Sequence, residues 1–247
     1  MKTLNAQALN RRDLLKITGV AAALSILPGV GGLARAAEGR KLRIGIVGSG
    51  HVGSALGGAW AKAGNQVMFS SRNLDSDKQL AAQIGTNARA GTPLEAVQFG
   101  QVLLFAVPYS AFPDLIKSLG DSLKGKVVIN ASNPFPQRDG DIATQARDQG
   151  AGAFDAKTFA GAYVVRAFNA VPAAHMGSAH EDPGKFGMPV AGDKKAIGLA
   201  SQLIREAGYV PVVVGGLDMA KYLMPGTPLA GEHTPAEVRS IAATLKP

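Results

Sequence analysis

The stretch IGIVGSGHVG, residues 44–53, decides the fold, because a Gly-x-Gly-x-x-Gly turn directly follows a short apolar run. The apolar residues within 42–47 predict a buried parallel strand, which is apolar on both faces. A helix over residues 52–63 and a second strand over 66–69 are expected next. Strand, turn, helix and strand in this order form the context in which such a turn binds a dinucleotide.

Each glycine of the turn has its own expected role. Gly48 allows a tight turn, Gly50 lets the backbone approach a pyrophosphate, and Gly53 lets the helix pack close to the strand. The helix directs its N-terminal amides and partial positive charge at the phosphates. A glycine-rich loop without a ligand is the alternative, since the chain has 31 glycines, but the flanking elements favour binding. The expected cofactor contacts here are Gly48, Ser49, Gly50, His51, Val52 and Gly53.

The end of the second strand indicates which dinucleotide is bound. An NAD site places a carboxylate here for the ribose hydroxyls, and that carboxylate repels a 2′-phosphate. This chain has Ser70, Ser71 and Arg72 instead, with Lys78 further along. Hydroxyl donors and a forked guanidinium suit a phosphate dianion, so these residues predict NADP(H) as the cofactor. The alternative is that Arg72 is a solvated surface residue.

The first 36 residues are typical of an export signal. Arg11-Arg12 matches the bacterial twin-arginine pattern, a weakly apolar stretch follows, and Ala34-Arg35-Ala36 offers a small-x-small cleavage site. We expect recognition by the twin-arginine export machinery and a periplasmic or other extracytoplasmic location, or a cytoplasmic one if the signal is not used. A disordered or amphipathic arm is the alternative. The nucleotide-binding domain is then expected over residues 37–247.

Charge and cysteine content narrow the function classes. The chain has 26 Lys and Arg against 18 Asp and Glu, but five of these bases and one acid lie in the first 36 residues, so the net charge of +8 falls to +4 without them. No run of bases interleaved with aromatic residues remains, so nucleic-acid binding has little support. The chain has no cysteine and therefore no disulfide, cysteine nucleophile or thiolate metal ligand.

Strands and helices alternate along the rest of the chain, which predicts an α/β fold with a Rossmann-type, doubly wound parallel sheet. The stretch 135–159 is rich in Gly, Asp and Gln and is interpreted as an irregular lid or connector. Thr234 is the expected cap of the last helix. Further strands are expected over 101–107, 126–130, 163–167, 188–191 and 210–214, and further helices over 77–84, 93–97, 111–119, 194–207 and 235–245.

Ligands of such a sheet bind beyond the carboxyl ends of the strands, here at the loops 49–52, 70–73, 107–110 and 132–135. The corner formed by Ala106, Val107 and Pro108 is therefore expected beside the nicotinamide half of the cofactor, together with Asn133. The alternative for Asn133 is a structural turn cap before a proline.

At these residues the chain resembles a known family, the NADP-dependent reductases of the deazaflavin coenzyme F-420 and related single-domain dinucleotide-binding oxidoreductases. The resemblance runs from about residue 42 to about 230 and is most distinctive at VVRAFN, residues 164–169, and at Gly192-Asp193. It implies a Rossmann-type core with a small C-terminal cap, from about residue 175. It also implies Ser71 and Arg72 on the 2′-phosphate.

The resemblance further implies hydride transfer between the nicotinamide and a partner ring. That ring, a deazaflavin coenzyme F-420 or a flavin as second substrate, is expected near Pro108, Asn133, Asn169 and residues 171–173. Lys221 and Met224 depart from the family pattern, because an arginine and an acid are expected there.

Neither a catalytic triad nor a metal cluster is evident. His175, His180 and His233 are interpreted as solvated loop residues, and His51 is interpreted as a surface residue at the helix start beside the phosphates, with a direct phosphate contact as the alternative. Hydride transfer between two bound rings needs mainly proximity and orientation, so this absence is expected. The predicted function is an NADP(H)-dependent oxidoreductase with a small-molecule electron acceptor or donor as partner, and a homodimer is left open. The alternatives are an NADP-binding module or sensor without catalysis, and a reductase of small imines or carbonyls.

Overall fold

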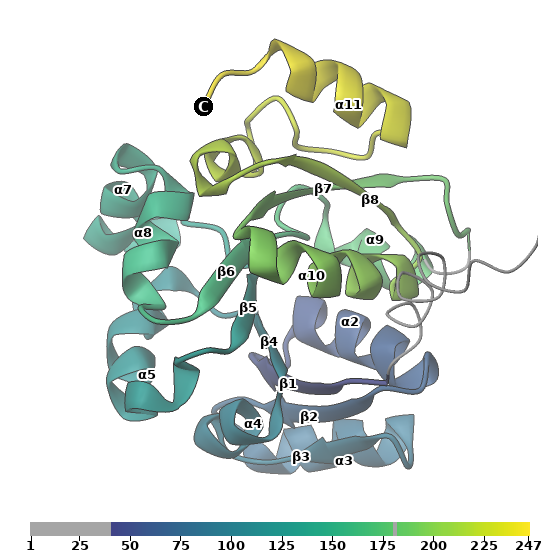
Figure 1. The fold of residues 1–247 in the computed structure, drawn as a ribbon. Coiled ribbons are helices and arrows are strands. Elements are labelled where there is room, and N and C mark those ends of the chain that lie inside the picture. Colours follow the sequence, from purple (N-terminus) through teal and green to yellow (C-terminus); the bar gives the residue numbers. More distant parts are fainter. Residues whose placement is uncertain (1–40, 180–181) are drawn as a thin grey trace, which may run out of the picture. The chain divides into compact units, whose positions relative to one another are not determined.

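An eight-stranded sheet forms the centre of the structure, a computed structural model that describes residues 41–179 and 182–247 (Figure 1). The expected signal over residues 1–36 and His180 lie outside the described residues. The strands lie in the order β3-β2-β1-β4-β5-β6-β7-β8. Their bounds are β1 Arg43–Val47, β2 Gln66–Ser70, β3 Ala88–Ala90, β4 Val102–Phe105, β5 Val127–Asn130, β6 Tyr163–Arg166, β7 Gly187–Gly192 and β8 Val210–Gly215.

The strand order reverses between β1 and β4. From β1 the chain moves outward to β2 and β3, and it then returns to β4 on the other side of β1. The loops that leave β1 and β4 diverge at this point and open a crevice at the carboxyl ends of the strands, where doubly wound sheets bind their ligands. The expected α/β sheet of Rossmann type is confirmed.

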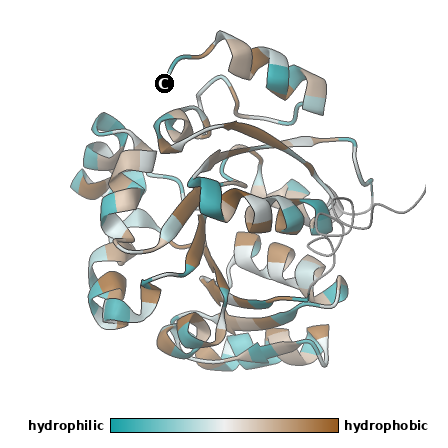
Figure 2. Ribbon diagram, in the orientation of Figure 1, coloured by the Kyte–Doolittle hydropathy of each residue, from teal (hydrophilic) through white to brown (hydrophobic). Residues whose placement is uncertain are grey.

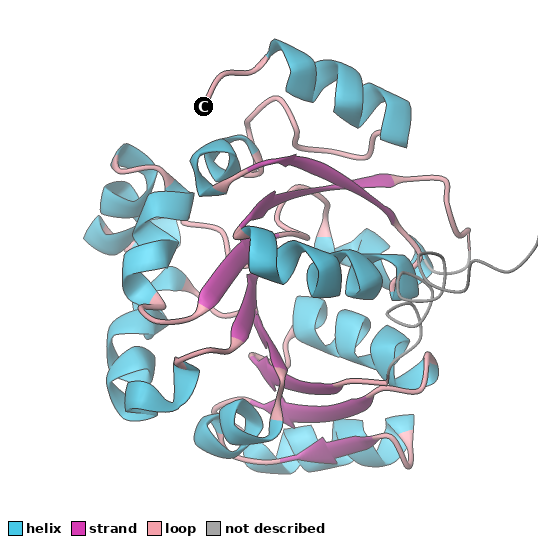
Figure 3. Cartoon of the chain, viewed as in Figure 1, coloured by secondary structure: helices cyan, strands magenta, loops and turns pink. Residues whose placement is uncertain are grey.

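Helices cover both faces of the sheet, as Figures 1 and 3 show. Strand side chains alternate between two hydrophobic clusters, with Leu104 and Ile129 in one and Leu103 and Val128 in the other. The central strands are therefore apolar on both faces, and they are largely brown in Figure 2. The first cluster packs under α2 (His51–Lys62), α3 (Leu74–Ile84), α9 (Ala173–Ala179) and α10 (Lys194–Glu206), and the second under α4 (Pro93–Phe99), α5 (Phe112–Leu119), α7 (Asp141–Asp148) and α8 (Ala151–Thr158).

The expected cap of the last helix is confirmed. At the start of α11 (Pro235–Thr244), the Thr234 hydroxyl accepts a hydrogen bond from the Glu237 amide, and the Glu237 carboxylate accepts one from the Thr234 amide. Two helical amides that have no partner within the helix are satisfied in this way, and Pro235 at the first helical position needs none. The same arrangement of Thr92 and Glu95 begins α4.

The strand β7 runs antiparallel to β6, which corrects the expectation of a fully parallel sheet. Val165 pairs with Gly192 and Arg166 with Ala191, so β7 begins beyond the carboxyl end of β6 and runs back along it. The crossover through α10 then makes β8 parallel to β7.

The stretch 135–159, expected to be irregular, contains three short helices: α6 (Pro136–Asp139), α7 and α8. Gly140 and Gly150, both with positive φ, separate them. Helices of four to eight residues give little hydrophobic periodicity, and the separating glycines are typical of a loop. The short strand β3 and the helix α9 were not expected either.

The C-terminal part continues the same sheet. The strands β7 and β8 pair with each other and extend the sheet beyond β6, and α11 and the 3-10 helix η3 (Leu217–Tyr222) pack against them. In Figure 1 this part, coloured green to yellow, lies at the top. No helix among the described residues is both long and apolar enough to cross a membrane.

Candidate functional site

The loop between β1 and α2 has the geometry that its three glycines predict. Gly48 has a φ of 102°, and a Cβ atom there would lie 2.4 Å from the carbonyl oxygen of Ala106. At Gly53 a Cβ atom would lie 1.9 Å from the carbonyl oxygen of Gly48, so only glycine allows the helix to pack this closely. At Gly50, in contrast, a Cβ atom would meet nothing within 4 Å.

The start of α2 is open to a ligand. Gly50 is the N-cap residue of the helix, and no side chain among the described residues caps it. The first amides of a helix have no partner within it, and they carry a partial positive charge. Uncapped amides next to the empty space at Gly50 fit a phosphate group, as the pyrophosphate of a dinucleotide requires.

A first cavity of about 940 Å³ extends from this loop toward the end of β2. The expected residues Gly48, Ser49, Gly50, Ser71 and Arg72 line it. Ser110, from the expected loop 107–110, lines it as well. Sequence reasoning did not assign the other lining residues from the start of α4, the 3-10 helix η1 (Tyr109–Ala111) and α5 to a site: Pro93, Ala111, Asp114, Leu115 and Ser118.

Arg72 lies at this cavity with its charge uncompensated. The side chain is exposed, and it makes no hydrogen bond or ion pair with any other residue that the structure describes. Its five N–H donors are therefore available to a ligand, and a guanidinium binds phosphate through two parallel hydrogen bonds.

The other polar residues expected near the 2′-phosphate are already engaged. Ser70 is buried and donates to the carbonyl oxygen of Ile46 at 2.7 Å, because its position in β2 turns it into the sheet. Ser71 lines the cavity but donates to Asp77, with 2.8 Å between Oγ and Oδ2. Lys78, outside both cavities, pairs with Asp75 at 3.1 Å on the exposed side of α3.

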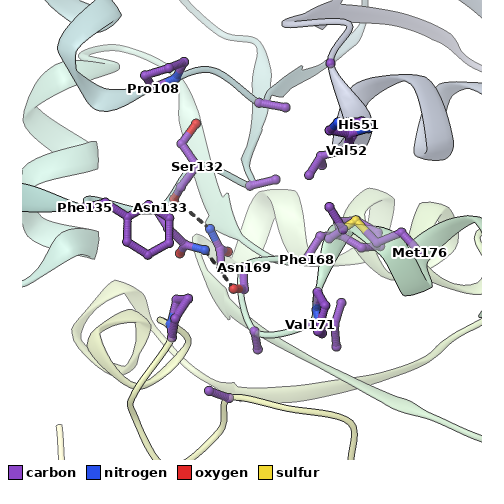
Figure 4. A pocket seen from close by; sticks show the side chains of 18 of the residues that line it. His51, Val52, Pro108, Ser132, Asn133, Phe135, Phe168, Asn169, Val171 and Met176 are labelled. Carbon is purple, nitrogen blue, oxygen red and sulfur yellow. Dashed lines mark hydrogen bonds between the residues drawn. The ribbon is translucent and has the colours of Figure 1, made fainter. Parts of the chain in front are cut away.

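A second cavity of about 610 Å³ (Figure 4) lies beside the first, and Gly50, Ala106, Val107 and Pro108 line both cavities. His51, Val52 and Asn133 also line it, as expected, whereas Gly53 packs inside the fold. Asn169 and residues 171–173, which the family resemblance implied, lie here too. Phe135, from the expected loop 132–135, lines it as well. The residues that sequence reasoning missed come from separate segments without a shared motif: Arg138, Phe168, Met176, Pro225, Gly226, Ala230 and Gly231.

Asparagines form one wall of the second cavity (Figure 4). The Asn133 side-chain amide donates to the carbonyl oxygen of Asn169 at 2.9 Å, and the Asn169 side-chain amide donates to the carbonyl oxygen of Ser132 at 2.9 Å. The Oδ1 atom of Asn133 has one long contact, 3.5 Å from Arg166, and the buried Oδ1 atom of Asn169 has no partner. The Asn133 side chain therefore makes a long-range contact and not the turn cap given as the alternative, and it still presents an amide oxygen at the cavity.

A buried charge cluster supports this wall from behind. Arg166 and Asp155, both fully buried, form an ion pair of 2.6 Å, and Arg166 also donates to the carbonyl oxygen of Ser132 at 2.9 Å. Tyr109 accepts from Arg166 and donates to Asp155, both at 2.7 Å. Burial raises the pKa of Tyr109 well above its usual range, so its hydroxyl stays protonated and keeps donating.

Phe168, in the wall of the second cavity, has a φ of 67°, the only positive φ of a non-glycine residue among those described. The ring packs edge-on against Trp60 and Tyr209, with centroids 6.0 and 6.2 Å away. Such a conformation costs of order 1–3 kcal/mol and persists where packing enforces it, often at functional sites. The turn at Phe168 brings residues 169–173 to the cavity.

The second cavity has few titratable side chains. Among the described residues that line it, only His51 and Arg138 can carry a charge. Arg138 is held by Asp139 at 2.7 Å and lies over the ring of Phe135, 5.0 Å from its centroid. The described part of the chain also contains no group of three His, Cys, Asp or Glu residues that could hold a metal ion.

The other described histidines lie outside both cavities. His175 lies 2.9 Å from Glu232, and His233 lies 3.1 Å from the carbonyl oxygen of Ala230. Neither of them reaches the wall formed by Asn133 and Asn169.

Comparisons with known proteins agree with this geometry. Residues 43–134 match the model of the family described as NADP oxidoreductase coenzyme F420-dependent. The metalloreductase STEAP3 of Rattus norvegicus is 29% identical over 180 residues, 72% of this chain, and the chain spans only 35% of that protein. The F420-dependent NADP reductase of Methanothermobacter marburgensis is 28% identical over 196 residues, 74% of this chain and 87% of that protein.

Among solved structures, a hypothetical protein from Sinorhizobium meliloti is 26% identical, with a TM-score of 0.66 and coverage of 77% of this chain and 93% of that one. These comparisons indicate that the protein is an oxidoreductase. They relate its residues 43–134 to the NADP oxidoreductases of the coenzyme F420-dependent family.

Proposed function

We propose that the protein binds NADP(H) across the two adjacent cavities and transfers hydride between the nicotinamide and a flat acceptor, a deazaflavin or flavin-like ring. The observation that carries this proposal is that four residues, Gly50, Ala106, Val107 and Pro108, line both cavities, so the cavities are adjacent. A dinucleotide is long enough to extend from a phosphate site at Arg72 past the start of α2. Its nicotinamide end would then lie in the second cavity.

The choice of NADP(H) over NAD(H) rests on Arg72. No acidic residue stands at the end of β2, and the guanidinium of Arg72 has no protein partner among the described residues. The uncapped amides of α2 would hold the pyrophosphate. When bound, NADPH supplies a hydride from its nicotinamide ring, and the protein supplies position and exclusion of water.

The second cavity favours a flat ring over an imine or carbonyl substrate. Val171, Met176 and Phe135 give it apolar walls, and no described acid, tyrosine or lysine lines it. Reduction of a small imine or carbonyl needs a proton for the product nitrogen or oxygen, and the cavity offers only His51 and Arg138 as ionisable groups. A ring that accepts hydride needs mainly to be placed close to the nicotinamide.

The first test compares NADPH and NADH binding to the wild type, Arg72→Ala and Lys78→Ala by fluorescence titration. The Arg72 substitution is expected to raise the Kd for NADPH about 10- to 100-fold, which corresponds to about 1.4–2.8 kcal/mol, and to leave the Kd for NADH almost unchanged. Lys78 is the matched control, because it is a nearby cation that lies outside the cavity.

Equal affinity of the wild type for NADPH and NADH would contradict the cofactor assignment, as would equal losses in the two variants. Tight NADPH binding without turnover against deazaflavins, flavins, quinones and ferric chelates would favour the second candidate, a non-catalytic binding or sensor module. That candidate leaves the apolar second cavity beside the phosphate site without a role.

A further inference from the structure

Asp77 stands out because its carboxylate is fully buried between two loops of the first cavity. It lies in the first turns of α3 and accepts a hydrogen bond from Ser49 at one oxygen and from Ser71 at the other. Ser49 belongs to the glycine loop after β1, and Ser71 belongs to the loop after β2. Both serines line the first cavity, whereas Asp77 lies behind them.

We propose that Asp77 is a positioning residue for the dinucleotide: it joins the glycine loop to the loop after β2 and holds them at the spacing that the bound cofactor needs. The proposal rests on the proposed function, since the cofactor is the ligand that contacts both loops. It also gives a reason for a buried carboxylate, which is costly to keep in a protein unless hydrogen bonds satisfy it.

The direction of these hydrogen bonds changes the role expected for Ser71. A hydroxyl has a single proton, and the Ser71 oxygen lies 2.8 Å from Asp77 Oδ2 and 3.3 Å from the Asn73 carbonyl oxygen, so the shorter contact assigns that proton to Asp77. The Ser71 oxygen also accepts the amide proton of Asn73 at 3.1 Å. Ser71 therefore shapes the loop, while Arg72 remains the residue that offers charge and free donors to a 2′-phosphate.

The position of Asp77 is itself well fixed. Its amide donates to the carbonyl oxygen of Asn73 at 3.1 Å, and Asn73 caps α3 by accepting from the Ser76 amide at 3.1 Å. The carboxylate is thus held by a capped helix and not by a flexible loop. Both loops gain a fixed anchor before any ligand binds, which lowers the entropy cost of binding.

The test uses the full-length protein with Asp77→Ala, Asp77→Asn and, as a matched control, Asp75→Ala. Asp75 is an exposed carboxylate on the same helix, and it contacts Lys78 but neither loop. Asp77→Ala is expected to raise the Kd and the KM for NADPH at least tenfold and to raise those for NADH by a similar factor, with kcat at saturating cofactor unchanged. Asp77→Asn keeps a group that can bond to both serines, so it is expected to recover most of the affinity.

A combined variant separates positioning from a general loss of fold. If Asp77 acts through the two serines, adding Asp77→Ala to Ser49→Ala/Ser71→Ala is expected to weaken NADPH binding less than twofold further. NADPH affinity within twofold of the wild type in Asp77→Ala would overturn the proposal. So would an equal loss in Asp75→Ala, or a fall in kcat without a change in KM.

Amide hydrogen exchange in the absence of cofactor distinguishes a failure of this proposal from a failure of the proposed function. Asp77→Ala is expected to speed exchange in both loops, residues 48–50 and 70–73, and to leave the central strands β4 and β5 unchanged. If the wild type binds neither dinucleotide, the proposed function fails, and this exchange result alone decides whether Asp77 joins the loops. In that case, unchanged exchange in either loop would contradict the proposal that Asp77 joins the two loops.

Discussion

Gly50 and Gly53 stand three residues apart, yet a Cβ atom would meet open space at Gly50 and the Gly48 carbonyl oxygen, at 1.9 Å, at Gly53. The same residue type is therefore required for two different reasons. Gly53 allows α2 to pack against the end of β1, so it contributes to the stability of the fold. Gly50 leaves room beside the uncapped amides of α2, so it contributes to ligand binding.

Alanine substitutions at three glycines of α2 and its N-cap are expected to separate these effects. Gly53→Ala should destabilise the fold by roughly 3 kcal/mol, because backbone must move to accept the methyl group. Gly50→Ala should leave the free energy of unfolding almost unchanged but raise the Kd for NADPH at least tenfold. Gly58→Ala, in open space within the helix, is the control and should stabilise by up to about 1 kcal/mol without affecting binding.

Chemical denaturation and NADPH titration measure the two quantities independently. Equal losses in the free energy of unfolding for Gly50→Ala and Gly53→Ala would show that the fold itself requires a glycine at position 50. Unchanged NADPH affinity in Gly50→Ala would show that no phosphate approaches the backbone there.

At the scale of the elements, a second buried carboxylate connects two more loops of the site. Asp139, at the end of α6, accepts from the hydroxyl of Ser110 at 3.1 Å in the loop after β4. It also accepts from the amide of Phe135 at 3.3 Å and from Arg138 at 2.7 Å. Burial raises the pKa of Asp139, but the hydrogen bonds from Arg138, Phe135 and Ser110 outweigh it and hold the pKa below its ordinary value.

This pKa direction predicts how stability depends on pH. A carboxyl group whose pKa is lowered by folding stabilises the protein above its unfolded pKa of about 3.9, and the contribution is lost as the pH falls through the folded pKa. Asp139→Asn should therefore lower the free energy of unfolding by about 2 kcal/mol at pH 7, and this difference should shrink as the pH falls below about 4. Urea titrations at several pH values measure it, with exposed Asp148→Asn as the control. A difference that is independent of pH would contradict the role of the charge.

The elements with a strong local pattern could be predicted from the sequence, and those set by long-range contacts could not. The apolar strands around Ile46, Leu104 and Ile129 and the cap at Thr234 depend on neighbours in the chain. The antiparallel direction of β7 depends on the end of β6 beyond which β7 begins, which no local pattern records.

The residues of the site also fall into those that a local pattern predicts and those that only long-range contacts bring together. The glycine loop and Arg72 could be found because a motif places them at the ends of consecutive strands. Asp77 carries no motif, since its function depends on hydrogen bonds to Ser49 and Ser71 in separate loops. The residues at Pro225 and Gly231 join the second cavity through tertiary folding of the C-terminal part, so their spacing gave no signal.

For the whole molecule, two adjacent cavities with four lining residues in common lie at the switch point between β1 and β4. The first presents the free charge of Arg72 and the amides of α2, and the second presents apolar walls with the oxygens of Asn133 and Asn169. This division suits a charged cofactor in one part and an uncharged ring in the other. Export of the protein by the twin-arginine route stays a prediction from Arg11 and Arg12.

The most direct measurement of the central claim is the rate of NADPH oxidation by the purified protein with deazaflavin, flavin and ferric chelate acceptors. The account predicts oxidation that needs both the protein and an acceptor, that is faster with NADPH than with NADH at equal concentration, and that slows when the transferred hydrogen at the nicotinamide C4 is deuterium. Bound NADPH that no acceptor oxidises, or turnover that is equally fast with NADH, would contradict it.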